Sequence, residues 1–81
     1  MANSLHTPEY EHFRSLLIAV REKKGFTQAD ISAQLGRPQS FVSKYESGER
    51  RLDVVEFLEV CRALETDPKT IIKKMEAGIP A

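Results

Sequence analysis

Apolar side chains recur along this chain at spacings of three and four residues, which is the period of an α-helix. In residues 8–24 they fall on one face, and a basic turn before Gly25 marks the end of that segment. The apolar positions there are Tyr10, Phe13, Leu16, Leu17 and Val20. No segment alternates apolar and polar residues as a half-buried strand does. The pattern therefore predicts an all-α fold.

Capping residues and prolines predict where further helices begin. Thr7-Pro8 and Asp67-Pro68 each place a capping residue before a proline, which is favoured at the first helical position. Another helix is expected to open at Leu52-Asp53 and to run to about residue 65. With the central segment described next, this makes five helices. The predicted organisation is a flexible N-terminus over residues 1–7, one domain over residues 8–77 and a C-terminal tail over residues 78–81.

Residues 27–46, TQADISAQLGRPQSFVSKYE, predict two short helices joined by a tight turn. Thr27 caps the first of them, and Asp30 completes a pattern that resembles a capping box. Gly36 ends that helix because glycine adopts a left-handed conformation without a Cβ penalty. Pro38 then begins a second helix over residues 38–46, and Gly48 ends it. Such a pair is typical of a DNA-binding helix-turn-helix.

The second of these helices is expected to have a buried side and a polar side. Val42 and Tyr45 lie three residues apart and form the buried side. Phe41 has two interpretations, as a core residue or as a contact to a thymine methyl group. The polar residues left on or near the outward side are Gln39, Ser40, Ser43 and Lys44.

The charge balance limits how strongly the chain attracts nucleic acid without sequence preference. The chain has 12 basic and 12 acidic residues, and its net charge is zero. Residues 37–51 carry four basic and two acidic residues, so this segment is locally positive. The acidic residues of the predicted fourth helix are expected to face away from a duplex: Asp53, Glu56, Glu59 and Glu65. Glu46 is expected either to pair with Arg50 or Arg51 or to be solvated.

The segment TQADISAQLG followed by RPQSFVSKYESGERRLD closely resembles the Cro and lambda-repressor-type helix-turn-helix family of phage and bacterial regulators, the XRE family. The resemblance covers residues 13–64, and more loosely extends to residue 75. It departs at Ser32, where the family usually carries alanine, and at Arg37-Pro38, where an aliphatic residue and a capping serine are common. The resemblance implies a compact five-helix lambda-repressor-like domain and a sequence-specific DNA-binding transcriptional regulator, with repression as the expected role.

The resemblance also implies roles for individual residues. Gln39 matches a glutamine that commonly pairs with adenine N6 and N7 in the major groove. Gln28 matches a residue that binds a backbone phosphate and braces the helix that contacts bases. The expected base contacts are Gln39, Ser40, Ser43 and Lys44, although Lys44 alternatively neutralises a phosphate or pairs with a carboxylate. The expected phosphate contacts are Gln28, Arg37, Arg50 and Arg51.

Nothing in the sequence predicts catalysis. His6 and His12 lie far from Cys61, and no metal-ligand spacing or cofactor motif occurs, so we expect no enzymatic activity, no metal and no cofactor. Cys61 lies among apolar residues and is expected to be a buried packing thiol. No long apolar run and no secretory segment occurs, so we expect no membrane association and a cytoplasmic location.

The predicted fourth helix has more apolar residues than one face holds: Val54, Val55, Phe57, Leu58, Val60, Cys61 and Leu64. This surplus, with Ile71, Ile72, Met75 or Ile79, is expected to form a homodimer interface that places two helices on a palindromic operator in double-stranded DNA. The alternative is that these residues are simply core. Two other functions stay open at this point: a protein-interaction module on the same scaffold, and an antitoxin or phage-immunity component.

Overall fold

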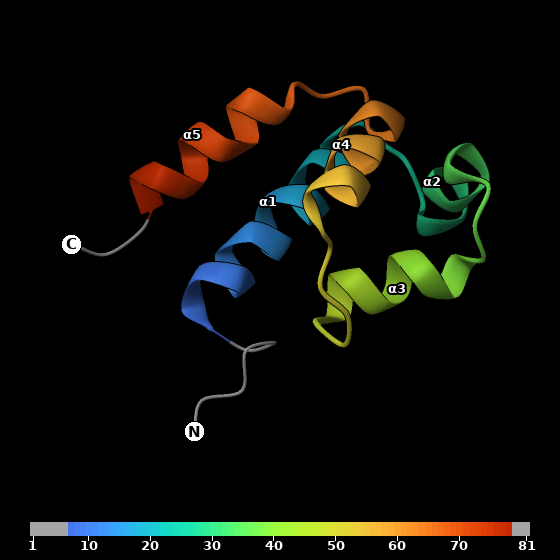
Figure 1. Ribbon diagram of the computed structural model, residues 1–81. Coiled ribbons are helices and arrows are strands. Elements are labelled where there is room, and N and C mark those ends of the chain that lie inside the picture. Colours follow the sequence, from blue (N-terminus) through green and yellow to red (C-terminus); the bar gives the residue numbers. More distant parts are fainter. Residues whose placement is uncertain (1–6, 79–81) are drawn as a thin grey trace.

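The computed structural model describes residues 7–78, and these form five helices without a strand. They are α1 (Pro8–Lys23), α2 (Gln28–Leu35), α3 (Gln39–Ser47), α4 (Val54–Ala63) and α5 (Pro68–Gly78). Helices α2 and α3 lie at one end of the molecule, and α5 lies along α1 towards the other end (Figure 1). The all-α prediction and the number of helices are confirmed.

The predicted caps form at Thr7 and Thr27. The Thr7 hydroxyl accepts a hydrogen bond from the backbone N–H of Tyr10 at 3.1 Å. Thr27 and Asp30 form a complete capping box at the start of α2, because each side chain accepts from the other residue's backbone N–H. Gly36 then ends α2 in the left-handed region, with φ 68°. The predicted start of α2 after Thr27 and its predicted end at Gly36 are therefore confirmed.

Two helix boundaries differ from the predictions. Helix α3 runs from Gln39 to Ser47 instead of 38–46, because Pro38 adopts an extended ψ of 152° and serves as the N-cap. Helix α4 ends at Ala63 instead of near residue 65, and Glu65 has a left-handed φ of 58°. Gly78 belongs to α5, although the tail was expected to begin there. Residues 1–6 of the predicted flexible N-terminus, and residues 79–81 with Ile79, lie outside the described residues.

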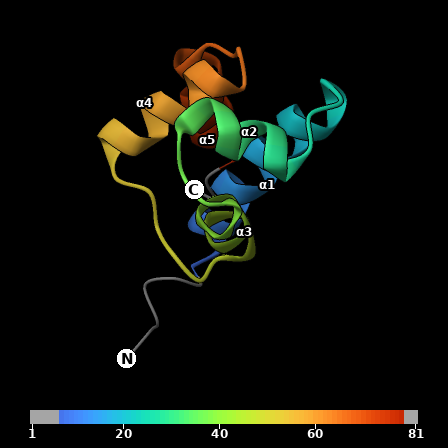
Figure 2. The same ribbon diagram turned by 90° about the vertical axis from the view of Figure 1, so that its right-hand side faces the viewer.

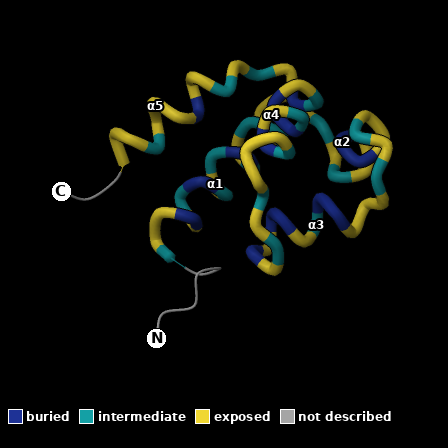
Figure 3. Tube along the Cα trace, viewed as in Figure 1, coloured by how far each residue is buried: buried dark blue, intermediate teal, exposed yellow. Residues whose placement is uncertain are grey.

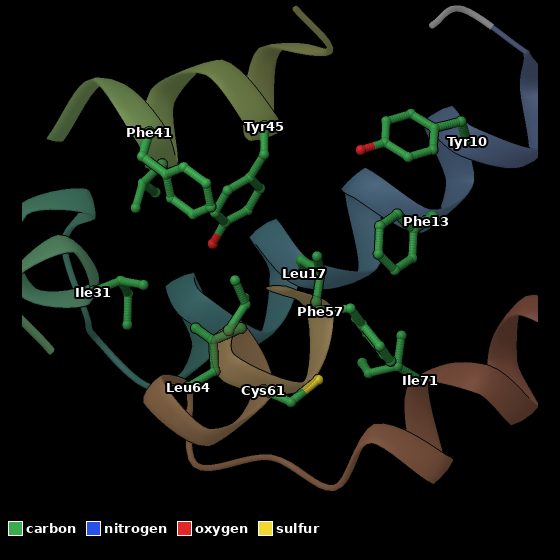
Figure 4. Close-up of a cluster of buried hydrophobic side chains, with 12 residues drawn as sticks. Tyr10, Phe13, Leu17, Ile31, Phe41, Tyr45, Phe57, Cys61, Leu64 and Ile71 are labelled. Atoms are coloured by element: carbon green, nitrogen blue, oxygen red, sulfur yellow. The ribbon is translucent and has the colours of Figure 1, made fainter. Parts of the chain in front are cut away.

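The core lies where α1, α3 and α4 meet, with single residues of α2 and α5 completing it (Figure 4). The Phe13 ring lies 5.4 Å from the Tyr10 ring and 5.3 Å from the Phe57 ring, which are favourable aromatic separations. Cys61 is buried as expected, and burial raises the pKa of its thiol to about 11. The buried apolar residues of the described chain are Tyr10, Phe13, Leu17, Ile31, Phe41, Val42, Tyr45, Phe57, Val60, Cys61, Leu64 and Ile71.

The fraction of buried residues differs between α3 and α5. Helix α3 alternates buried and exposed positions, whereas α5 has one buried residue, Ile71, and is otherwise mostly exposed (Figure 3). In residues 7–78, no helix combines the length and the apolar character that a bilayer-spanning segment needs.

Candidate nucleic-acid interface

Helix α3 has a buried face and a polar face, as the sequence predicts. Val42 and Tyr45 have exposed fractions of 0% and 1% and attach the helix to the core. Gln39, Ser40 and Lys44 are exposed, and Ser43 is half-buried, with its hydroxyl donating to the Ser40 carbonyl at 3.2 Å. Lys44 makes no ion pair with any residue in the range 7–78, so the paired interpretation of Lys44 gains no support. The four predicted base contacts therefore lie together on α3.

Phe41 is a core residue. Its side chain is only 8% exposed, and its ring meets the Tyr45 ring at an interplanar angle of 71°. The guanidinium groups of Arg37 and Arg50 lie 4.4 and 4.7 Å from the centre of the Phe41 ring. These neighbours cover the ring, so the interpretation of Phe41 as a thymine contact is not supported by its position.

Glu46 holds α3 against α1 and α2, and both expectations for this residue were wrong. Its side chain is 6% exposed and pairs with Arg21 of α1, at 2.7 Å from Nε to Oε2 and 3.1 Å from Nη2 to Oε1. Gln28 of α2 donates its amide to Glu46 Oε1 at 2.9 Å. The hydrogen bond to Glu46 also raises the pKa of Arg21. One buried carboxylate therefore connects the three helices that carry and orient the polar face of α3.

Gln28 thus fulfils one part of the role that the resemblance implies. Its amide braces α3 through Glu46, at the N-terminus of α2, and the side chain remains partly exposed. The amide nitrogen carries two hydrogens. The bond to Glu46 therefore leaves one amide hydrogen of Gln28 unused.

The turn after α3 requires glycine. Gly48 has a φ of 88°, a conformation that side chains rarely adopt. A Cβ atom at this position would lie 3.2 Å from the guanidinium carbon of Arg14. Arg14 also donates to the carbonyl of Glu46. Both the backbone conformation and the neighbouring Arg14 side chain therefore disfavour a side chain at Gly48.

The loop between α3 and α4 is attached to α1 by Tyr10. The Tyr10 hydroxyl donates to the carbonyl of Arg50 at 3.2 Å and accepts from the N–H of Leu52 at 3.0 Å. The guanidinium of Arg51 lies 4.4 Å from the centre of the Tyr10 ring, and its side chain is exposed without an ion pair within residues 7–78. The sequence indicated Tyr10 only as a core residue, because its two loop partners lie 40 and 42 residues away.

Helix α4 places two carboxylates, Glu56 and Glu59, beside two of the predicted phosphate contacts, although the acidic residues of this helix were expected to face away from a duplex. Arg50 forms a two-pronged pair with Glu56, at 3.0 Å from Nη1 to Oε1 and 2.6 Å from Nη2 to Oε2. Arg37 lies 3.5 Å from Glu56 and 3.3 Å from Glu59. In Figure 2 the loop between α3 and α4, which carries Arg50, rises from the lower end of α3 to the start of α4. Arg37 and Arg50 are thus neutralised by α4, whereas Lys44 and Arg51 are not.

Among residues 7–78 no three His, Cys, Asp or Glu side chains gather closely enough to hold a metal ion. The protonated Cys61 thiol is 1% exposed. What the surface presents is an arrangement of amide, hydroxyl and cationic groups on and beside one helix, which defines a helix-turn-helix of the DNA-binding class.

Comparisons with known proteins agree with this class. A family model described as helix-turn-helix matches residues 17–71. The chain is 50% identical to an XRE-family like protein from Pseudomonas syringae pv. tomato, with a TM-score of 0.84 over 89% of this chain and 88% of that chain. Among curated protein sequences, none matches this chain. The chain belongs to the XRE-type helix-turn-helix family of DNA-binding transcriptional regulators.

Two further solved structures share the fold. The restriction-modification controller protein C.AhdI from Aeromonas hydrophila is 26% identical, with a TM-score of 0.73 over 80% of this chain and 98% of that chain. The controller protein C.Esp1396I, solved as a tetramer with its 35 base-pair operator, is 17% identical, with a TM-score of 0.80 over 89% of this chain and 95% of that chain. At this identity the second likeness shows the fold alone.

Proposed function

We propose that this protein represses transcription by inserting α3 into the major groove of a specific operator. The observation that carries the proposal is the division of α3, whose exposed face holds Gln39, Ser40 and Lys44 while Val42 and Tyr45 fix the opposite face. A helix of this kind fits the major groove, where amide, hydroxyl and ammonium groups distinguish base pairs. Ser43 lies at the edge of the same face and completes the set of base contacts.

The proposed phosphate contacts flank α3. Gln28 lies at the N-terminus of α2, where the helix dipole favours an anion. Arg51 lies in the loop after α3 with its charge unpaired among the described residues, and Arg37 and Arg50 lie on the α4 side of the recognition helix. In this proposal Gln28 and Arg51 bind phosphate directly, whereas Arg37 and Arg50 must first separate from their carboxylate partners.

We further propose that two copies bind together. Helices α4 and α5 expose Val54, Val55, Leu58 and Ile72, of which Val54 is 74% exposed. Isolated exposed residues need no explanation, but four of them on adjoining helices form a surface that a second copy would cover. A twofold pair would place its α3 helices about 34 Å apart on a palindrome. No catalytic step is part of this proposal.

The test begins with selection of bound duplexes from a randomised pool by the purified protein. On the selected operator, Gln39→Ala is expected to cost about 1–3 kcal/mol and to relax the preference at one base pair. Gln34→Ala is the matched control, because Gln34 is an exposed glutamine of α2 that lies beside α4. Arg51→Ala is expected to weaken binding to all sequences and to reduce the salt slope by about one.

The outcomes separate a DNA-binding repressor from a protein-interaction module. Unchanged binding after Gln39→Ala would refute the assignment of Gln39 as a base contact. A protein-interaction module would retain no duplex at low salt and would enrich no sequence. Repression itself is measured with a reporter gene, whose expression should fall when the selected operator overlaps its promoter and should recover with Gln39→Ala.

A further inference from the structure

Two arginines beside the recognition helix are bound to carboxylates of the same chain. Glu56 accepts from both terminal nitrogens of Arg50, and Arg37 lies within 3.5 Å of the same carboxylate. Glu59 contacts Arg37 at 3.3 Å. Both guanidinium groups also stack on Phe41 of α3. The four charged groups balance, so this corner of the molecule has no net charge.

The Glu56 carboxylate is held in place by its own helix, and Arg37 and Arg50 are more exposed than it is. Glu56 accepts from the backbone N–H of Asp53 at 3.0 Å, while its own N–H donates to the Asp53 carboxylate at 2.7 Å. This capping box ties the Glu56 side chain to the first turn of α4. The Glu56 side chain is 12% exposed, whereas those of Arg37 and Arg50 are 36% and 38% exposed.

A carboxylate and a phosphate present similar oxygen pairs to an arginine. Each forms two parallel N–H···O bonds with the planar fork of a guanidinium. Arg50 already uses Nη1 and Nη2 on Glu56, and Nη1 also contacts the Arg51 carbonyl at 3.1 Å. A DNA phosphate that binds this fork must therefore displace Glu56 from it.

We propose that Glu56 is a built-in competitor of DNA phosphates, which holds Arg50 and Arg37 and thereby lowers the affinity of the protein for DNA of any sequence. The inference rests on the proposed function and names how the same surface is regulated. The competition acts on phosphate contacts, which carry no sequence information, so it leaves recognition by Gln39 and Lys44 in place. The position of Glu56 and Glu59 beside these arginines, and not the net charge of the chain, is then what limits non-specific binding.

Glu56→Gln is the direct test. Glutamine keeps the capping box, because Gln serves at its third helical position as Glu does, but it removes the charge that holds the arginines. Binding is measured by fluorescence anisotropy with a short duplex of random sequence, between about 50 and 200 mM KCl. Each recovered phosphate contact steepens the salt slope by about 0.9 and tightens binding at about 50 mM about tenfold. Glu59→Gln should give a smaller gain, because Glu59 contacts Arg37 alone.

Two controls isolate the mechanism. Glu76→Gln makes the same change of net charge on an exposed residue of α5, far from α3, and should leave the slope unchanged. In the background of Arg37→Ala with Arg50→Ala, Glu56→Gln should give no gain. Thermal unfolding followed by circular dichroism confirms that each variant is folded at the temperature of the binding assay.

Three results would overturn the proposal. Equal gains from Glu56→Gln and Glu76→Gln would assign the effect to net charge alone. Weaker binding by Glu56→Gln would mean that Glu56 positions the arginines for phosphate instead of competing with it. A gain that persists without Arg37 and Arg50 would exclude them as the released groups. If the proposed function itself fails, the result differs from all three, because the unmodified protein and every variant then retain no duplex at low salt.

Discussion

Glu46→Gln is expected to destabilise the fold more than any other exchange of a carboxylate for its amide. Glu46 accepts three hydrogen bonds, two from Arg21 and one from Gln28, and its side chain is 6% exposed. Removing one partner of a buried ion pair costs about 3–5 kcal/mol. Arg21 retains 13% exposure and a bond to the Phe26 carbonyl, so we expect the lower end, about 3 kcal/mol.

The expected loss is large against the total stability of a chain of 81 residues, which is about 4–12 kcal/mol. It corresponds to a Tm lower by at least about 12 °C. Urea titration followed by circular dichroism measures the free energy of unfolding of the protein and of Glu46→Gln. Glu76→Gln serves as the control and should change it by less than about 0.5 kcal/mol, because Glu76 is exposed. A loss below about 1 kcal/mol for Glu46→Gln would refute the reasoning, since the pair would then behave like an exposed one.

Two further predictions concern pH and assembly. The hydrogen bonds from Arg50 and from the Asp53 backbone lower the pKa of Glu56 from 4.5 to about 2, so the stability that this carboxylate contributes is present above pH 4.5 and is lost as the pH falls towards 2. Because Arg50 is 38% exposed, we expect a contribution of about 1 kcal/mol, visible as a pH dependence of unfolding that Glu56→Gln lacks. Leu58→Lys places a charge in the exposed patch of α4 and is expected to yield monomers in sedimentation equilibrium, with weaker binding to a palindromic operator; an unchanged mass would exclude this patch as the interface.

The helices could be predicted from the sequence because their signals are local. Thr27 and Asp30 are three residues apart and form the capping box that their spacing indicates. Val42 and Tyr45 were placed in the core by the helical period alone. The predicted start of α3 was one residue too early. The preset φ of Pro38 suits both the N-cap and the first helical position, and Pro38 has no side-chain oxygen that would mark it as a cap in the sequence.

The ion pairs could not be predicted in the same way, because their partners are chosen by packing. Glu46 is five residues or fewer from both arginines considered for it, yet it pairs with Arg21, which is 25 residues away. Nearness along the chain was misleading here, since the Glu46 side chain points into the junction with α1 and α2, while Arg50 lies in the loop beyond Gly48.

Ion pairs with α4 change how the positive charge of residues 37–51 is interpreted. Counting residues 37–51 gave a positive segment, but the structure pairs Arg37 and Arg50 with carboxylates that lie outside that segment. Lys44 and Arg51 keep their charges unpaired among residues 7–78; Lys44 lies on the exposed face of α3, and Arg51 lies in the loop that follows it. Only unpaired cations can bind phosphates without first breaking an ion pair within the protein. The cationic surface available to DNA is therefore smaller than the sequence suggests. We therefore expect weak non-specific affinity because of where the acidic residues lie, and not because of the zero net charge by itself.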